Sequence, residues 1–571
     1  MDKKWHLAEK VDKDFLEKFP EINNTVLQLL HNRGISSEAD IDKFLNSDYL
    51  TDLHDPFLFR DGKKAVERIL KAIEGKENIV VYGDYDADGV TSTAVMVETL
   101  EALGSKAKVY IPFRETEGYG LNMEAVKGLV KEKANLVITV DCGISNVEEA
   151  EFLQKEGVDI IITDHHQEPI ELPKAFAILN PNVKAETYPF RSLAGCGVAF
   201  KLCQGLIKEH QNYKVKQVDE GFEKWLLDIV AIGTIADMQP ILNENRVLVK
   251  YGLVVLQKTK RLGILKLIEF MSSKLTSIDE RVVGWQITPR LNAAGRLNHA
   301  SAAYQLLITE DVAEAEKLAN ELNDTNKQRQ QITEKIGLEV NEQIGEVKGQ
   351  KILIAVGDGW PIGVVGLAAG RLSNKHHLPS LVISRYNGEI IGSGRSISEF
   401  NIIKALQQCD ELLTRYGGHP QACGFTIKDE ESLIKFRTKL EEIALAELGD
   451  QKLVPTVDID SEIKLEEVNW DLFKQLEKFM PYGQGNNKPI FLSKDLTVSQ
   501  CQTVGPEGKH LRLIVKHQTE IIRKTIGFGF GHQFGELKEG DKVDMVFEID
   551  INEWNGNREL QLRIIDLKSS D

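Results

Sequence analysis

The chain has 571 residues, too many for one hydrophobic core, and this length predicts three or four domains. Its formal net charge of -17 excludes a surface that binds polyanions as a whole, although a local basic cleft stays compatible with it. The six cysteines lack Cys-x-x-Cys spacing, and the chain shows neither an apolar leader nor a run near the roughly 18 residues of a membrane span. We therefore expect a reduced, cytoplasmic protein with no membrane partner.

Residues 1–60 carry short amphipathic patterns and predict a helical extension, and a helix is expected over Ala65–Gly75. From Asn78 onward, apolar strand patterns alternate with amphipathic helix patterns, which predicts a doubly wound parallel sheet. The expected strands are Ile79–Tyr82, Ala107–Ile111, Leu136–Val140, Asp159–Thr163 and Ala175–Leu179. The expected helices between them are Thr91–Leu103, Asn122–Lys131 and Asn146–Glu156.

Acidic residues follow three of these strands. Asp84, Asp86 and Asp88 follow the first, Asp141 follows the third, and Asp164-His165-His166 follow the fourth. Each group alone is compatible with a helix cap or a solvated turn. The carboxyl ends of parallel strands meet at one edge, however, and carboxylates gathered there repel one another unless a cation joins them. Mg²⁺ and Mn²⁺ favour such oxygen ligands, so we predict a metal site.

Further candidates follow along the chain. Asp237 ends a long apolar segment that also contains Asp228, and it is interpreted as a further metal ligand or as a cap before Pro240. A helix is expected over Asn243–Gln257. Residues 287–298 are predicted to be an irregular loop in which Arg290 or Arg296 approaches phosphates, or one whose arginines are structural.

A long helix from Thr309, as N-cap, to about Ile344 is expected to bridge two domains. A second α/β pattern begins at Lys351–Val356. In it, Ser393, Arg395 and Ser396 are predicted on a Gly-rich turn, and His419 in a Gly-rich loop. These segments suit a phosphate cradle, or are ordinary hairpin turns.

Five strand patterns end the chain and predict a small β-barrel of the OB type, a fold that often binds single strands. They are Leu496–Val504, Leu511–Val515, Glu520–Gly527, Lys542–Asp550 and Leu560–Asp566. Basic and aromatic residues available for binding are Lys509, His510, Arg512, Lys516, Arg523, Lys524, Phe528 and Phe530.

Taken together, these segments resemble the DHH phosphoesterase superfamily, and within it the RecJ family of single-strand-specific exonucleases. The resemblance covers about residues 60–571, in the family's order, and rests on eight motifs. They are Gly83–Gly89, Val140–Gly143, Asp164–His166, Gly233–Pro240, Arg290–Arg296, Gly392–Ser396, Gly417–Gly424 and Pro481–Asn486. It implies a DHH domain (61–300), a bridging helix (301–348), a DHH-associated domain (349–450) and an OB-like domain (451–571), after the extension of residues 1–60.

The resemblance also implies hydrolysis of single-stranded DNA from the 5′ end to mononucleotides, in DNA repair and recombination, with two Mn²⁺ or Mg²⁺ ions. By the same resemblance the metal ligands are Asp86, Asp88, Asp141, His165 and Asp237, with Asp84 and His166 completing the cluster. Arg114, Ser393 and Arg395, together with Arg290 and Ser396, are expected to bind the 5′ phosphate and backbone, and Arg296 and His419 to act near the scissile phosphate. A monomer is expected, with single-stranded-DNA-binding protein and a RecQ-like helicase as partners.

Other functions of this superfamily are weighed against this one. A phosphodiesterase of short oligonucleotides or cyclic dinucleotides is generally shorter and lacks the OB-like extension. An inorganic pyrophosphatase has a histidine where this chain has Tyr82, and we expect Asp84 to take its place. A non-catalytic replication scaffold has lost acidic ligands that are all present here.

Overall fold

The computed structural model describes residues 3–271, 273–517, 521–554 and 556–570. They divide into two compact units, one made of residues 1–52, 240–246 and 454–571, the other of residues 53–239 and 247–453. None of the helices described is long and apolar enough to cross a membrane.

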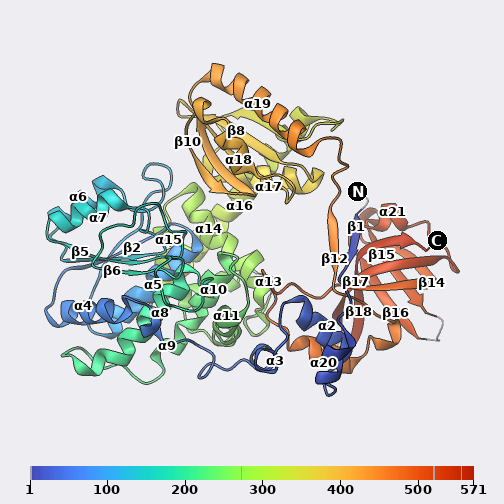
Figure 1. The fold of residues 1–571 in the computed structure, drawn as a ribbon, viewed down its shortest axis with the longest axis horizontal. Coiled ribbons are helices and arrows are strands. Elements are labelled where there is room, and N and C mark those ends of the chain that lie inside the picture. The colour runs from blue at the N-terminus through green and yellow to red at the C-terminus, as the bar shows by residue number, and fades with distance from the viewer. Residues whose placement is uncertain (1–2, 272, 518–520, 555, 571) are drawn as a thin grey trace. The chain divides into compact units, whose positions relative to one another are not determined.

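The larger unit is built on a five-stranded parallel sheet of order β3-β2-β4-β5-β6 (Figure 1). Its strands are β2 (Ile79–Gly83), β3 (Lys108–Tyr110), β4 (Leu136–Val140), β5 (Asp159–Thr163) and β6 (Ala177–Leu179). Helices α5 (Ala87–Ala102), α6 (Met123–Lys131) and α7 (Val147–Lys155) connect consecutive strands. Every residue of β2 and β4 is buried, as expected for strands covered on both faces. The predicted doubly wound sheet is confirmed.

The larger unit contains more helices between residues 62 and 297. They are α4 (Gly62–Glu74), α8 (Gly195–Glu209), α9 (Phe222–Trp225), α10 (Leu227–Ala236), α11 (Asn243–Leu256), α12 (Leu262–Ile268), α13 (Glu280–Val282) and α14 (Thr288–Leu297). Residues 243–246, at the start of α11, belong to the smaller unit. The predicted irregular loop at 287–298 is wrong, because α14 occupies it. Its small residues serve close packing: a Cβ on Gly295 would lie 2.5 Å from the carbonyl oxygen of Tyr85.

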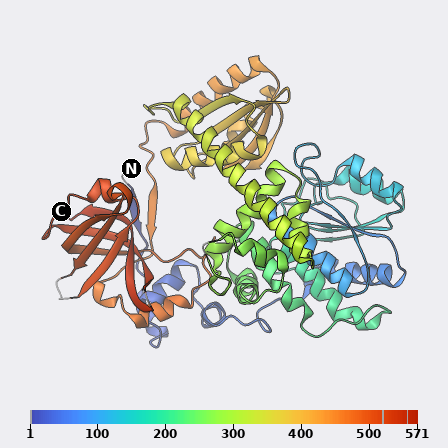
Figure 2. The same cartoon turned by 180° about the vertical axis from the view of Figure 1, so that it is seen from behind.

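A helix of 33 residues, α16 (Val312–Ile344), is the yellow-green helix of Figure 2. Its N-cap is Asp311, which accepts the N–H of Glu314 at 2.7 Å, and the expectation of Thr309 at this position is wrong. Thr309 instead ends a separate helix, α15 (Ser301–Ile308), so the segment predicted as one bridging helix contains two.

The second sheet of this unit has the order β10-β11-β9-β8-β7, in which only β7 and β8 are parallel. Its strands are β7 (Leu353–Asp358), β8 (Ser380–Tyr386), β9 (Glu389–Arg395), β10 (Leu413–His419) and β11 (Ala422–Ile427), with helices α17 (Ile362–His376), α18 (Ile402–Gln407) and α19 (Glu430–Leu448). Ser393 and Arg395 therefore lie on a strand, and His419 ends another. The predicted Gly-rich turn at Ser393 is wrong, whereas the alternative of an ordinary hairpin is confirmed for the His419 segment, because β10 and β11 pair antiparallel with His419 opposite Ala422. The glycines of β9 leave room for packing, since a Cβ on Gly392 would lie 2.3 Å from the Phe425 ring.

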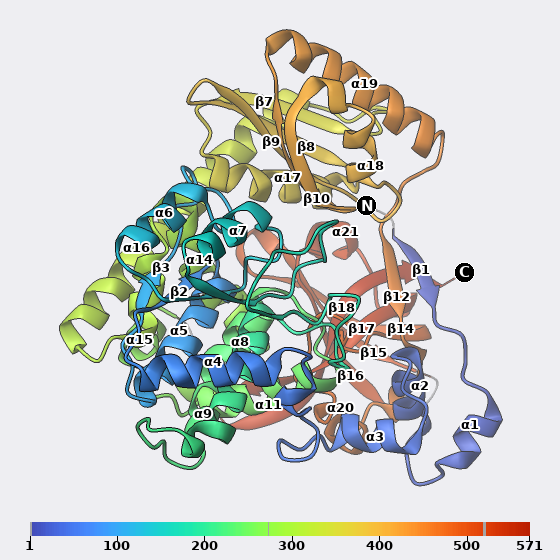
Figure 3. The same ribbon diagram turned by 60° about the vertical axis from the view of Figure 1, so that its left-hand side comes forward.

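The smaller unit contains a closed barrel of β14 (Phe491–Val504), β15 (His510–Lys516), β16 (Ile522–Gly527), β18 (Asn557–Ser569) and β17 (Lys542–Trp554), closed by pairing of β14 with β17. This confirms the OB-like fold; Glu520, the expected start of the third strand, lies outside the described residues. Further elements are β1 (Lys4–Leu7), β12 (Thr456–Ile459), β13 (Ser461–Glu462), α1 (Lys13–Lys18), α2 (Asn24–Asn32), α3 (Glu38–Leu45), α20 (Trp470–Glu477) and α21 (Gly531–Phe534). The expected purely helical extension thus begins with a strand, β1, which pairs in parallel with β12 (Figure 3).

Candidate metal centre and phosphate-binding residues

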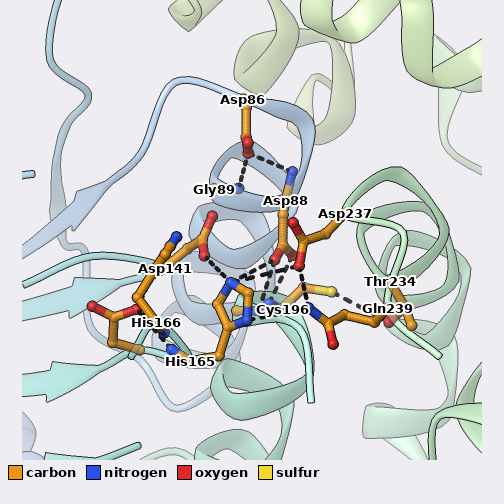
Figure 4. Close-up of polar contacts among 12 residues, drawn as sticks. Asp86, Asp88, Gly89, Asp141, His165, His166, Cys196, Thr234, Asp237 and Gln239 are labelled. Atoms are coloured by element: carbon orange, nitrogen blue, oxygen red, sulfur yellow. Dashed lines mark hydrogen bonds and ion pairs between the residues drawn. The ribbon is translucent and has the colours of Figure 1, made fainter. Parts of the chain in front are cut away.

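The acidic and histidine side chains predicted as ligands meet at the carboxyl edge of the parallel sheet (Figure 4). Three groups have ligand atoms that all lie within 4.8 Å of one another. They are Asp84, Asp86 and Asp141; Asp88, His165 and Asp237; and Asp141, His165 and His166. Asp141 and His165 each belong to two groups, so the groups form one continuous cluster.

Two of these carboxylates also accept hydrogen bonds from the first turns of helices. Asp86 is the N-cap of α5, and its Oδ1 accepts the N–H groups of Asp88 and Gly89 at 2.9 and 3.0 Å. Asp88 accepts the N–H groups of Gly195 and Cys196, at the start of α8, at 2.7 and 2.9 Å. The capping and ligand interpretations of this stretch are therefore compatible, because each carboxylate is fixed by backbone donors.

Asp141 lies at the centre of the cluster in a left-handed conformation, with φ at 60°. A Cβ on Gly195 would lie 2.4 Å from its Oδ1, so only glycine fits there. That oxygen is buried and makes no hydrogen bond within the described residues, although His165 Nε2 lies 3.1 Å away. Asp84 Oδ1 is buried and unbonded in the same sense. Buried acceptors without a donor are costly, which favours a cation at this place.

The atoms around His165 Nε2 have the spacing of metal ligands. Nε2 lies 3.1 Å from Asp141, 3.6 Å from Asp237 and 3.9 Å from Asp88. In octahedral coordination at about 2.1 Å, adjacent ligand atoms lie about 3.0 Å apart and opposite ones about 4.2 Å apart. The three separations fall within this range, so the residues present fit a Mg²⁺- or Mn²⁺-type ion.

Burial and mutual repulsion disfavour the charged form of these carboxyls. Burial, together with neighbouring aspartates, raises the pKa of Asp84, Asp88 and Asp141, and raises that of Asp237 to about 8. Burial lowers the pKa of His165, which keeps its imidazole neutral, as a metal ligand requires. Divalent cations would supply the positive charge that the cluster lacks.

Asp164 positions both histidines, and the sequence-based ligand set left it out. Its Oδ1 accepts the N–H groups of His165 and His166 at 2.7 and 3.0 Å, and it lies 2.7 Å from His166 Nδ1. Burial alone would lower the pKa of His166, but the hydrogen bond and charge of Asp164 raise it to about 9. The signal was present in the sequence, since Asp164 directly precedes the two histidines.

Two tyrosines near the cluster form hydrogen bonds through their hydroxyl groups. Tyr119, which the prediction missed, places its hydroxyl 2.9 Å from His166 Nδ1. Tyr82, at the position where pyrophosphatases carry histidine, is fully buried in the core and donates to the carbonyl of Gly120 at 3.1 Å.

Three of the predicted phosphate-binding arginines come together. Arg296 of α14 donates to the carbonyl of Gly363 at 2.9 Å. Its pKa is lowered to about 10, first by burial and then by the charge of Arg114, and the charge of Arg395 contributes. The Arg114 guanidinium lies 5.0 Å from the centre of the Tyr85 ring. Arg395 Nη1 donates to Ser393 Oγ at 3.0 Å.

The other predicted contacts are not brought into this group. Arg290 donates to the carbonyls of Gln286 and Phe270 and to Asn323, and Ser396 donates to the carbonyl of Phe400 at 2.7 Å. His419 is exposed and ends β10. It pairs with Ala422 of β11, and Ala422 pairs on its other side with Arg395 of β9. Among the described residues, no hydrogen bond or ion pair joins it to the cluster.

Comparison with known proteins agrees with the fold. Family models match residues 78–234 (DHH family, N-terminal domain), 349–446 (DHHA1 domain) and 459–566 (RecJ OB domain). The single-stranded-DNA-specific exonuclease RecJ of Bacillus subtilis is 37% identical over all of this chain and 71% of its own length. That of Escherichia coli is 32% identical over 88% of this chain and 89% of its own.

A crystal structure of RecJ from Thermus thermophilus in complex with Mn²⁺ is similar to the whole chain with a TM-score of 0.84. It is 27% identical in sequence, and the match covers 80% of that chain. A Mg²⁺ complex from the same organism matches with a TM-score of 0.79 and 26% identity, over all of this chain and 79% of that one. With these relatives and all three domain matches in order, the chain belongs to the RecJ family of single-stranded-DNA-specific exonucleases.

Proposed function

We propose that this protein is a metal-dependent exonuclease that hydrolyses single-stranded DNA from the 5′ end to mononucleotides. The observation that carries the proposal is the convergence of three carboxylates on His165 Nε2, at 3.1–3.9 Å. The RecJ relatives are named for single-stranded-DNA-specific exonuclease activity, and two solved RecJ structures hold Mn²⁺ or Mg²⁺. Phosphodiester hydrolysis is a reaction for which paired divalent ions are well suited.

Asp86, Asp88, Asp141, His165 and Asp237 would hold two ions, and Asp84 and His166 would complete the cluster. When bound, Mn²⁺ or Mg²⁺ supplies Lewis-acid chemistry, which activates water and offsets negative charge on the leaving oxygen. The carboxylates fix where positive charge can collect, and Asp164 orients both imidazoles. His166 is held beside this centre by Asp164, whose Oδ1 lies 2.7 Å from its Nδ1.

Arg114, Ser393 and Arg395 would bind the 5′-terminal phosphate, and Arg296 the backbone next to the scissile bond. Guanidinium groups form paired hydrogen bonds with phosphate oxygens, and these three arginines form no ion pair within the described ranges. His419 would contact the backbone once a strand is bound. Arg290 and Ser396, whose donors already bond to the protein, would support the segments around the strand rather than bind it directly.

The matched family segments also support the domain division. We propose an N-terminal extension (1–60), a DHH domain (61–300), a bridging segment (301–348), a DHH-associated domain (349–450) and an OB-like domain (451–571). Single-stranded DNA is the substrate that the OB-like barrel would help to hold. Single-stranded-DNA-binding protein and a RecQ-like helicase as partners, a monomeric state and a cytoplasmic location belong to the same proposal.

The rival activities differ in substrate, so substrate range tests the proposal. A long single strand, the matching blunt duplex and a 5′-phosphorylated dinucleotide are each incubated with the protein and Mn²⁺, Mg²⁺ or EDTA. We expect mononucleotides from the single strand with either ion and none with EDTA. Faster hydrolysis of the dinucleotide than of the long strand would favour an oligonucleotide phosphodiesterase, and no hydrolysis at all would favour a scaffold.

A further inference from the structure

Several arginines of the larger unit lack the carboxylate partners that other arginines of this acidic chain have. Arg68, Arg261 and Arg385 each contact two carboxylates. Within the described ranges, Arg114, Arg296, Arg329, Arg371 and Arg395 form no ion pair. Three of the five belong to the phosphate-binding group above. Arg329 and Arg371 have no role in it.

Arg329 and Arg371 lie where three helices meet. Helix α14 packs against α16, which carries Arg329, and against α17, which carries Arg371. A Cβ on Gly363, in α17, would lie 2.4 Å from the carbonyl oxygen of Arg296, so the two helices approach with their backbones nearly in contact. This close approach places Arg296 beside the first turn of α17.

The side chain of Arg395, from β9, lies against the next turns of α17. A Cβ on Gly366 would lie 3.0 Å from Ser393 Oγ and 3.1 Å from Arg395 Nη2, and one on Gly370 would lie 3.7 Å from Arg395 Cγ. Arg371 directly follows Gly370. The helix therefore runs from Arg296, past the Ser393–Arg395 pair, to Arg371.

The guanidinium of Arg329 is only partly satisfied. Its Nη2 donates to Asn326 at 2.8 Å, but its Nε is buried and has no hydrogen-bond partner among the described residues. Burial and then the charge of Arg371 lower its pKa, and its own charge acts on Arg296 in turn. Helix α16, which carries Arg329, packs against both α14, which carries Arg296, and α17, which carries Arg371.

The sequence offers these two arginines no local counter-charge. The residues three and four positions from Arg329 on α16 are Thr325, Asn326, Ile332 and Thr333. Those around Arg371 on α17 are Leu367, Ala368, Asn374 and Lys375. Like charges held together without a counter-charge destabilise a fold, unless an anion binds between them.

We propose that Arg329 and Arg371 bind a further phosphate group of the strand, distinct from the terminal and scissile phosphates. The inference rests on the proposed function for the identity of the strand. A phosphate of this kind has two sources: a backbone phosphodiester farther along the chain, or the outer phosphates of a polyphosphorylated 5′ end. Both present oxygens that match an unpaired guanidinium.

The test compares the unmutated protein with Arg329→Gln and Arg371→Gln on three fluorescent ligands. These are a 5′-phosphorylated 20-mer, a 5′-phosphorylated dinucleotide and a 20-mer with a 5′-triphosphate. Binding is read by anisotropy with metal omitted, over a range of salt concentrations. Lys335→Gln, on the exposed face of α16, is the matched control for loss of one charge.

We expect each arginine variant to weaken binding about tenfold, either of both 20-mers or of the triphosphate strand alone. The slope of log affinity against log salt concentration should become shallower by about 0.7. Lys335→Gln should change neither the affinity nor this slope. Weakening of both 20-mers with the dinucleotide unchanged assigns the site to a backbone phosphate. Weakening confined to the triphosphate strand assigns it to a polyphosphorylated end. Equal weakening of all three ligands, or none, would overturn the proposal.

Two features keep the test decisive. Arg371 is exposed, so its variant should fold even if the partly buried Arg329 does not tolerate glutamine. Binding is measured without hydrolysis, so an inactive unmutated protein would reject the proposed function while this measurement still tests the two arginines.

Discussion

Replacing Asp141 with asparagine should make the metal-free protein more stable while destroying its metal site. Asparagine keeps the side-chain shape and tolerates the left-handed backbone at φ 60°, which alanine would adopt at a cost of about 1–2 kcal/mol. The substitution removes a negative charge from a buried cluster whose Asp141 Oδ1 has no hydrogen bond within the described residues. Leaving such a group unsatisfied costs about 1–3 kcal/mol.

A gain of that size corresponds to a rise of about 2–12 °C in the melting temperature in EDTA at pH 8, by the scaling for domains of 150–250 residues. The sign of the pH dependence follows from the raised pKa of Asp141. Because the folded state binds the proton more tightly than the unfolded state, the unmutated protein loses stability as the pH rises through the folded pKa. The advantage of the variant should therefore shrink as the pH is lowered.

Added Mn²⁺ should reverse the order of the two proteins. A ligand at 100 times its Kd stabilises the fold by about 2.7 kcal/mol, which the unmutated protein gains and the variant largely does not. Hydrolysis should fall at least about 100-fold in the variant. Thermal melts in EDTA and in Mn²⁺, at pH 6 and 8, measure all of this. A variant that melts below the unmutated protein in EDTA at pH 8, or gains as much from Mn²⁺, would refute the reasoning.

Three further predictions concern the surroundings of the cluster. Asp164→Asn should lower the pKa of His166 from about 9 toward its ordinary value and weaken Mn²⁺ binding about 10–100-fold. NMR titration of His166 measures the pKa, and calorimetry measures metal binding. An unchanged pKa would contradict the role given to Asp164. Gly195→Ala should abolish stabilisation by Mn²⁺ without removing any ligand, because the new Cβ would lie 2.4 Å from Asp141 Oδ1. Gly128→Ala, in open space on α6, is the control and should keep the Mn²⁺ stabilisation. Equal shifts in melting temperature with Mn²⁺ for the two variants would count against this steric argument. Arg395→Ala should lower the preference for a 5′-phosphate over a 5′-hydroxyl end about tenfold in KM for a single strand, and an unmutated protein that shows no such preference would exclude the pocket.

The parallel sheet and most of the cluster could be predicted from the sequence, because both follow from short-range patterns. Buried strands such as Leu136–Val140 appear as uninterrupted apolar runs, and the residue after each strand must lie at the sheet's edge. Asp237 could be predicted for a similar reason, since it ends the apolar helix α10.

Long-range packing explains what the sequence could not predict. Gly295 and Gly392 resemble turn residues locally, yet each is needed because another backbone or ring lies against it. The same ambiguity turned α14 into an expected loop and β9 into an expected turn. The positions of the arginines relative to one another depend on how three helices pack. This packing separates Arg290 from Arg296 and brings Arg329 toward Arg296, and residue spacing along the chain does not predict it.

The direction of digestion tests the central claim most directly. One single strand is labelled at its 5′ end and another at its 3′ end, and each is digested with Mn²⁺ by the unmutated protein and by Asp141→Asn. We predict that the 5′ label appears as a mononucleotide from the first time point, that the 3′-labelled strand shortens progressively, and that the variant releases neither. A ladder of shortening 5′-labelled strands, or undiminished digestion by Asp141→Asn, would contradict the account.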